Sequence, residues 1–176
     1  MLWLFLVTVT MLFAAFSSAL IVSRSDSLSN GTWNGFEIPA AFYVSTVIIV
    51  ISSISLQWSY FAARRNNLVL NRILLWITMI LGISFVVSQC MGYRALIHEN
   101  VYLSGNNLNG SYFYIISAIH ALHLVGGVIF VLFTLISSYR YRVHSRSMLR
   151  INLCTTYWHF IGGLWVYLFI LLNVFS

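Results

Sequence analysis

The sequence has few charged residues, and none of them is lysine. Only 7% of its 176 residues are charged, whereas 60% are hydrophobic. A soluble domain usually has about 25% charged residues, most of them on its water-facing surface. Nine arginines and three acidic residues cannot supply such a surface for a chain of this length. The composition therefore predicts an integral membrane protein whose surface is mostly in contact with lipid.

Proline and cysteine are also scarce, with one proline and two cysteines in the whole chain. Pro39 stands at the start of an apolar stretch, where a missing backbone N–H interrupts no helix. Cys90 and Cys154 lie near the ends of different apolar stretches that should reach opposite sides of the membrane. A disulfide needs Cα atoms within about 7 Å, so we expect no bond between them. We predict that both thiols are buried and unreactive.

Five hydrophobic stretches are long enough to cross the hydrocarbon core of a bilayer, which takes about 20 helical residues. They cover residues 2–22, 38–63, 71–96, 111–138 and 150–175. The predicted fold class is therefore all-α, with residues 1–176 forming a single membrane domain, a polytopic bundle of five transmembrane helices. No basic segment precedes the first stretch, so we expect it to remain as a helix, although Ser17-Ser18-Ala19 offers the small residues of a signal-peptide cleavage site.

The arginines are distributed unevenly between the two sides of the membrane. Seven of them flank or occupy the second and fourth gaps between stretches: Arg64, Arg65, Arg72, Arg140, Arg142, Arg146 and Arg150. Only Arg24 and Arg94 fall on the other side, together with all three acidic residues. Cytoplasmic loops collect arginine and lysine, so we predict a cytoplasmic N-terminus and an outside C-terminus. This distribution is typical of membrane topology and not of a nucleic-acid-binding face.

Acidic residues and lysine are absent from the five hydrophobic stretches. Proteins that carry ions or protons by themselves usually place such groups inside the membrane. We therefore do not expect a self-contained transporter. No paired nucleophile and base, and no glycine-rich phosphate loop, stands out in the sequence either.

Three histidines are the polar residues most able to carry chemistry. His120 and His123 are three residues apart and so share one helical face, and His159 follows Trp158 in the last stretch. One interpretation is that a histidine of the fourth helix and His159 ligate a haem between two helices. The other is that all three make polar contacts with neighbouring helices or with lipid. We favour the second interpretation, because a haem held by two histidines needs one ligand from each of two helices, at matched depth in the membrane.

Two glycine pairs follow these histidines, Gly126-Gly127 and Gly162-Gly163. Small residues let helices approach closely in lipid, so the pairs predict packing between the fourth and fifth helices. Local bending, or room for a lipid tail, is the alternative explanation.

Other polar and aromatic residues stand near the ends of the helices. Trp158 is interpreted partly as an interfacial anchor, and as a residue for lipid or polar contacts between helices. Gln89, Tyr93 and Arg94 cluster at the end of the third helix. They could bind a phosphate or the carboxylate of a partner, although an arginine at a helix end more often extends to the head-group layer.

Several segments resemble subunit III of the haem-copper terminal oxidases, the family of cytochrome c oxidase and bacterial quinol oxidases. The segments that carry the likeness are Phe36–Pro39 with Ser52, Ser53 and Gln57; Gly110–Tyr114; the His-x-x-His segment Ser117–Gly127; and Thr156–Phe160 with Trp165. Their order along the chain matches that of the family. Two positions depart from the family's usual pattern: Gly162 replaces an aspartate, and Thr8-Val9 replaces an intramembrane Ser-Glu. The chain also lacks the two N-terminal helices of longer members, which form one wall of a lipid-filled cleft.

The resemblance implies a non-catalytic accessory subunit in aerobic respiration. Such a subunit packs against the catalytic subunit I, binds structural phospholipids, and supports sustained oxygen reduction and proton pumping by the complex. Haems and copper are expected in subunits I and II, with no cofactor bound by this chain. The implied partners are the other oxidase subunits, including those of a respiratory supercomplex, and the implied location is the bacterial cytoplasmic membrane. A haem b-binding anchor subunit of an electron-transfer complex is the alternative.

Overall fold

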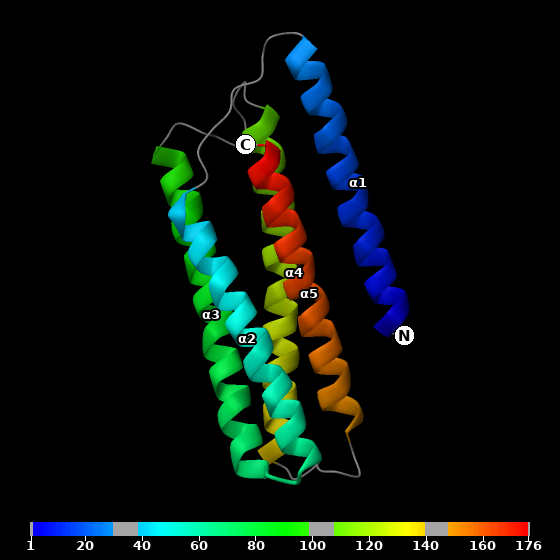
Figure 1. Cartoon of the computed structure of the whole chain (residues 1–176), viewed down its shortest axis with the longest axis vertical. Helices are drawn as coiled ribbons and strands as arrows, with labels where there is room; N and C mark the ends of the chain where they lie inside the picture. Colours follow the sequence, from blue (N-terminus) through cyan, green and yellow to red (C-terminus); the bar gives the residue numbers. More distant parts are fainter. Residues whose placement is uncertain (1, 30–38, 99–107, 140–147, 176) are drawn as a thin grey trace.

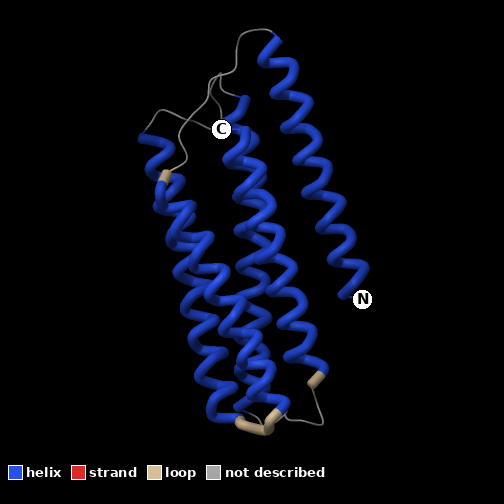
Figure 2. Tube along the Cα trace, viewed as in Figure 1, coloured by secondary structure: helices blue, strands red, loops and turns tan. Residues whose placement is uncertain are grey.

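The computed structural model describes residues 2–29, 39–98, 108–139 and 148–175, and these form one bundle of five α-helices. The helices are α1 (Leu2–Ser29), α2 (Ala40–Arg64), α3 (Leu68–His98), α4 (Leu108–Tyr139) and α5 (Leu149–Phe175). The helices α1, α3 and α5 run in one direction, while α2 and α4 run in the other (Figure 1). All five are long and apolar enough to cross a membrane, and the described residues contain no strand (Figure 2). The predicted all-α transmembrane bundle is confirmed.

The helices extend beyond the hydrophobic stretches that predict them. Helix α1 continues to Ser29 where the hydrophobic stretch ends at residue 22, and α4 begins at Leu108 where it begins at residue 111. Hydropathy marks the depth of the hydrocarbon layer, whereas a helix ends where its backbone hydrogen bonds end. Polar residues therefore continue these helices into the head-group region.

The most extensive contact in the bundle is between α2 and α3. A tight turn joins them, in which Asn66 has a φ of 60°, a left-handed conformation that asparagine tolerates better than most residues. Just beyond the turn, the fully buried Asn71 donates from Nδ2 to the backbone oxygen of Ser59 at 3.0 Å and to its Oγ at 2.9 Å. Ser138 of α4 donates to Asn71 Oδ1 at 2.9 Å. One asparagine therefore joins three helices at this end of the bundle.

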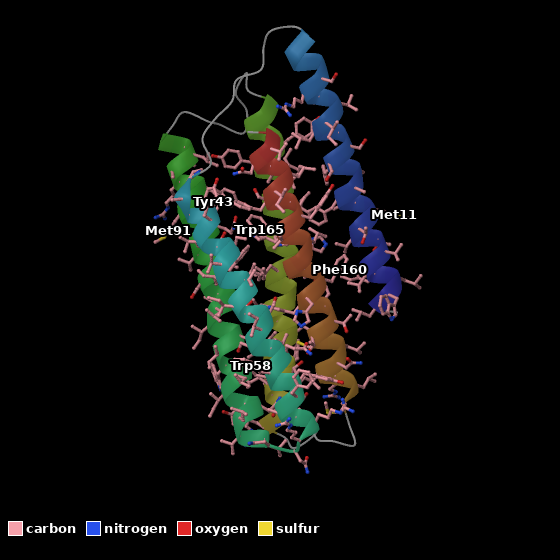
Figure 3. All side chains as sticks on the ribbon, in the orientation of Figure 1. Met11, Tyr43, Trp58, Met91, Phe160 and Trp165 are labelled. Atoms are coloured by element: carbon pink, nitrogen blue, oxygen red, sulfur yellow. The ribbon has the colours of Figure 1, made fainter. Side chains whose placement is uncertain are left out.

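Apolar side chains cover the outside of the bundle as well as its core. Met11 on α1 is 68% exposed and Met91 on α3 is 62% exposed, whereas Trp165 lies inside the bundle (Figure 3). Lipid satisfies outward-facing apolar side chains that water would not. Cys154 is buried as predicted, but Cys90 is exposed on α3, so the prediction of two buried thiols is wrong for Cys90. In lipid an apolar stretch has no preferred inward face, and a small thiol is tolerated on either side.

Helix α1 packs less extensively than the other helices. It contacts α4 and α5 through a row of buried side chains at helical spacing, Leu6, Val9, Phe13 and Leu20. Within the described residues it does not contact α2. Part of α5 therefore lies uncovered between α1 and α2.

Candidate functional site

Four side-chain hydrogen bonds join α2 to α5 along most of their length. Two of these bonds have an indole donor: Trp158 Nε1 donates to Ser52 Oγ at 3.0 Å, and Trp165 Nε1 donates to Thr46 Oγ1 at 3.1 Å. The other two pairs are His159 with Gln57 at 2.9 Å and Asn173 with Tyr43 at 2.6 Å. We call these eight residues the α2–α5 seam. In lipid, where burial alone does not drive helices together, such bonds help to fix which faces meet.

Trp158 is the most enclosed part of the seam. It is 2% exposed, and its ring packs against glycines of two other helices. A Cβ at Gly82 of α3 would lie 2.8 Å from the ring, and one at Gly127 of α4 would lie 3.3 Å from it. The interpretation of Trp158 as an interfacial anchor is therefore wrong. Glycines on the facing helices leave the space that this indole ring occupies.

His159 lies beside a groove between α2 and α5. It stands about 15 Å along α5 from Leu149, well away from either helix end. Gln57 Oε1 is an acceptor, so the 2.9 Å contact places a hydrogen on His159 Nε2. The groove has a volume of about 570 Å³ and is lined mainly by apolar side chains together with Ser53, Gln57, His159 and Gly163. It presents a narrow polar strip in an otherwise apolar wall.

A second groove, of about 510 Å³, lies between α1 and α5. Its lining includes Thr10 and Phe13 of α1, and it shares His159 and Gly163 with the first groove. The two grooves therefore meet on the outward face of α5, between the two helices that do not contact each other. Their elongated, weakly polar walls suit hydrocarbon chains better than a charged solute.

The other two predicted histidines face α1. The ring of His120 packs against Phe13 at 6.1 Å and against Trp165 at 5.0 Å between centroids, and the ring of His123 packs against Phe13 at 5.8 Å. His123 Nδ1 lies 2.8 Å from the backbone oxygen of Ile119 on its own helix. The structure thus brings His120 and His123 to one face, as their spacing predicts, while Nε2 of His159 bonds to α2.

The glycine pairs divide their contacts between neighbours. Gly127 faces Trp158 and Tyr157 of α5, and the nearest group to a Cβ at Gly126 would be the Tyr157 hydroxyl at 3.7 Å. Gly162 instead faces α2, with Ser53 Oγ 3.1 Å from the position of a Cβ. A Cβ at Gly163 would meet nothing within 4 Å, since that residue lines both grooves. Gly126 and Gly127 therefore face α5, whereas Gly162 faces α2 and Gly163 faces the open grooves.

The cluster at the end of α3 does not form a surface anion site. Gln89 is 1% exposed and donates from Nε2 to Ser45 Oγ of α2 at 2.9 Å. Tyr93 is half-buried beside Tyr114, and only Arg94 is exposed. Gln89 and Tyr93 are four residues apart and share one face of α3, whereas Arg94 is rotated away from that face, because successive residues are turned by about 100°.

Sequence reasoning named Ser52 as part of the family likeness but did not identify the serine hydroxyl groups of α2 as hydrogen-bond acceptors for neighbouring helices. Ser45, Ser52 and Ser59 are all buried and recur every seven residues, which places them on one helical face. That regular spacing within an apolar stretch is a signal that could have found them.

The described residues bring no three His, Cys, Asp or Glu side chains together as a metal site would require. His159 Nε2, the nitrogen exposed at the tip of the ring, is engaged with Gln57. The described contacts of these histidines are with neighbouring helices and, for His123, with the backbone of its own helix.

The indole bond of Trp158 gives a first test of the seam. Replacing Trp158 with phenylalanine keeps an aromatic ring but removes the donor to Ser52, so we expect a loss of about 1 kcal/mol in unfolding free energy. Detergent-mediated unfolding followed by fluorescence measures it. Ser52→Ala removes the same bond from the other side, and the double variant should lose less than both single variants together. Strict additivity would show that the bond contributes nothing.

The chain is similar to known proteins over nearly its full length. The family model described as cytochrome c oxidase subunit III matches residues 1–176. A probable cytochrome c oxidase subunit 3 from Nocardia farcinica is 31% identical over 163 residues, which are 90% of this chain and 78% of that protein. Cytochrome c oxidase subunit 3 from Corynebacterium diphtheriae is 27% identical over 164 residues, 91% of this chain and 79% of that protein. The corresponding protein from Spodoptera frugiperda is 30% identical over 138 residues, 78% of this chain and 89% of that protein.

Proposed function

The chain belongs to the cytochrome c oxidase subunit III family, and from this premise we propose that it is the non-catalytic accessory subunit of a haem-copper terminal oxidase. It is an integral protein of the bacterial cytoplasmic membrane and works with other oxidase subunits. In the proposed complex it packs against subunit I and supports sustained oxygen reduction and proton pumping. The family match over the whole chain is the observation that carries this proposal.

Docking on subunit I uses an apolar helix face. Large hydrophobic side chains project from all five helices. Those exposed on α3 include Ile73, Ile80, Ile83 and Val87. These four lie at spacings of three, four and seven residues, so they form one stripe along the helix. Such a stripe fits a neighbouring transmembrane helix through van der Waals packing. Haems and copper are assigned to subunits I and II.

Structural phospholipids are proposed to occupy the two grooves on α5. The grooves are long, apolar and open to the side of the bundle that α1 leaves uncovered. Gly162 lines the first groove at the position where the family motif usually has an aspartate. The groove therefore has no carboxylate at that point, which suits an acyl chain.

The bundle is proposed to have its N-terminus in the cytoplasm. Arg64, Arg72 and Arg150 lie at the end of the bundle where α2 meets α3 and where α5 begins, while Arg94 lies at the opposite end (Figure 1). By the positive-inside rule, the arginine-rich end faces the cytoplasm. Reporter fusions test this orientation: alkaline phosphatase fused after Ser176 should be active and green fluorescent protein should be dark there. The reverse pattern would refute the assignment.

Purification of the tagged chain in a mild detergent tests the function. We expect it to bring a haem-bearing subunit with it, and we expect the haem to remain with that subunit when the two are separated. A chain that purifies alone with one haem per polypeptide would instead support the anchor function.

Filling the grooves should release their lipid. Gly163→Phe places a ring where both grooves meet, so we expect fewer phospholipids per complex by native mass spectrometry and a several-fold faster loss of oxidase activity during turnover. Leu122→Phe, at a 71% exposed position on α4, is the matched control. Equal lipid content and equal inactivation rates in the two variants would argue against lipid in these grooves.

A further inference from the structure

A column of polar side chains lies between α3 and α4, apart from the grooves on α5. Because the two helices are antiparallel, their residues pair in levels. Phe85 meets His120, with ring centroids 6.2 Å apart, and Tyr93 meets Tyr114, with centroids 5.6 Å apart. Between these levels lie Gln89, one turn above Phe85, and Ser117, one turn above His120. The column runs from the end of the bundle where α4 begins to the buried His120.

Three atoms in this column lack a hydrogen-bond partner among the described residues: Gln89 Oε1, His120 Nε2 and the Tyr93 hydroxyl. The side chains of Gln89 and His120 are only 1% exposed. Each represents a buried polar group that destabilises the fold if it stays unsatisfied. Gln89 cannot turn away, because its Nε2 already donates to Ser45 Oγ. His120 is held by rings on three other helices, those of Phe13, Phe85 and Trp165.

Helix geometry indicates that the two side chains lean toward each other along the bundle axis. Helical side chains lean toward the N-terminus of their own helix. On α3 this direction takes Gln89 toward the level of His120, and on antiparallel α4 it takes His120 toward the level of Gln89. The acceptor on one side and the imidazole nitrogen on the other therefore converge from adjacent levels.

We propose that a water molecule binds between Gln89 Oε1 and His120 Nε2 and exchanges with the surface through the polar column of Tyr93, Ser117 and Tyr114. Water can donate to the amide oxygen and either donate to or accept from the imidazole, so it fits both tautomers of His120. Among the described residues, the contacts of Gln89 and His120 involve no charged side chain, which makes a bound ion a poor fit. The buried Tyr93 hydroxyl is a further group that water in this column can satisfy, and the Tyr114 hydroxyl donates to the backbone oxygen of Tyr93 at 3.5 Å. These groups extend the polar path to the end of the bundle.

This water site gives His120 a function distinct from that of the other histidines. It would connect the centre of the bundle to water at the end where α3 ends and α4 begins. His159, in contrast, bonds to Gln57 beside the α5 grooves, and His123 bonds within its own helix. The site is independent of lipid in those grooves.

A density map of the chain with its partner subunits, at a resolution that shows ordered water, tests the proposal directly. We expect a peak within about 3 Å of both Gln89 Oε1 and His120 Nε2. Gln89→Leu should remove that peak. A map that shows other buried waters but none here, or one in which the two side chains meet directly, would overturn the proposal.

A double-mutant cycle gives a second, thermal measurement on the same complex. Gln89→Leu and His120→Leu should each lower the melting temperature of the subunit, because each leaves the bound water with one partner fewer. The double variant should lose clearly less than the two shifts combined. His123→Leu with Gln89→Leu is the control pair and should be additive. Additivity in both cycles would refute the bridge, and if the variants fail to assemble, the map of the unaltered complex still decides.

Discussion

Asn71→Leu is expected to lower the free energy of unfolding by about 2 kcal/mol, since the side chain makes three hydrogen bonds and each contributes on average about 0.6 kcal/mol between membrane helices. The loss should be this large because Asn71 is fully buried and its bonds reach both α2 and α4. Leucine would fill the volume but leave Ser59 and Ser138 without this partner. Reversible unfolding in mixed detergent micelles, followed by tryptophan fluorescence, measures the change.

Asn152→Leu is the matched control for this prediction. It makes the same chemical change on α5, but at an exposed position. We expect a change within about 0.5 kcal/mol, as for most substitutions on a surface. If Asn71→Leu were equally mild, the network that joins α2, α3 and α4 would contribute little to stability.

Gly92→Ala is expected to destabilise the chain by about 1–3 kcal/mol through overpacking. A Cβ at this position of α3 would lie 2.5 Å from the Phe42 ring of α2. Phe42 cannot easily move aside, because it is fully buried and packs on Trp165 at 6.5 Å and Tyr93 at 6.0 Å between centroids. The same unfolding assay measures the loss, and a lower yield of assembled complex should accompany it.

Gly163→Ala makes the same substitution where the groove leaves room. A Cβ there meets nothing within 4 Å, so only the higher helix propensity of alanine should act, which amounts to a gain of up to about 1 kcal/mol. The two variants should therefore differ in sign. A loss of similar size in both would mean that glycine itself, and not the contact with Phe42, is required in these helices.

The number and identity of the helices could be predicted because hydrocarbon imposes a simple length and composition on any segment that crosses it. The family could be predicted from short motifs, and several of those motifs meet in space. Ser52 and Gln57 of α2 bond to Trp158 and His159 of α5, although more than 100 residues separate the partners. Residues that carry the resemblance are thus joined in one seam.

The direction of individual side chains could not be predicted in the same way. Trp158 is buried and is not an interfacial anchor, Gln89 faces α2 and not the surface, and Cys90 faces outward. In a soluble protein, polar and apolar faces distinguish the outside of a helix from the inside. Here apolar residues cover both, so hydropathy identifies a spanning helix without orienting it about its own axis.

The sequence by itself determined that this protein consists of five membrane-spanning helices of the subunit III family, because apolar length and short motifs are local properties of the chain. Only the tertiary structure decided that His159 bonds to Gln57 beside two apolar grooves and that His120 is enclosed by aromatic rings from other helices. These outcomes depend on helix rotation. That rotation is set by glycine contacts and a small number of hydrogen bonds between residues far apart in the chain.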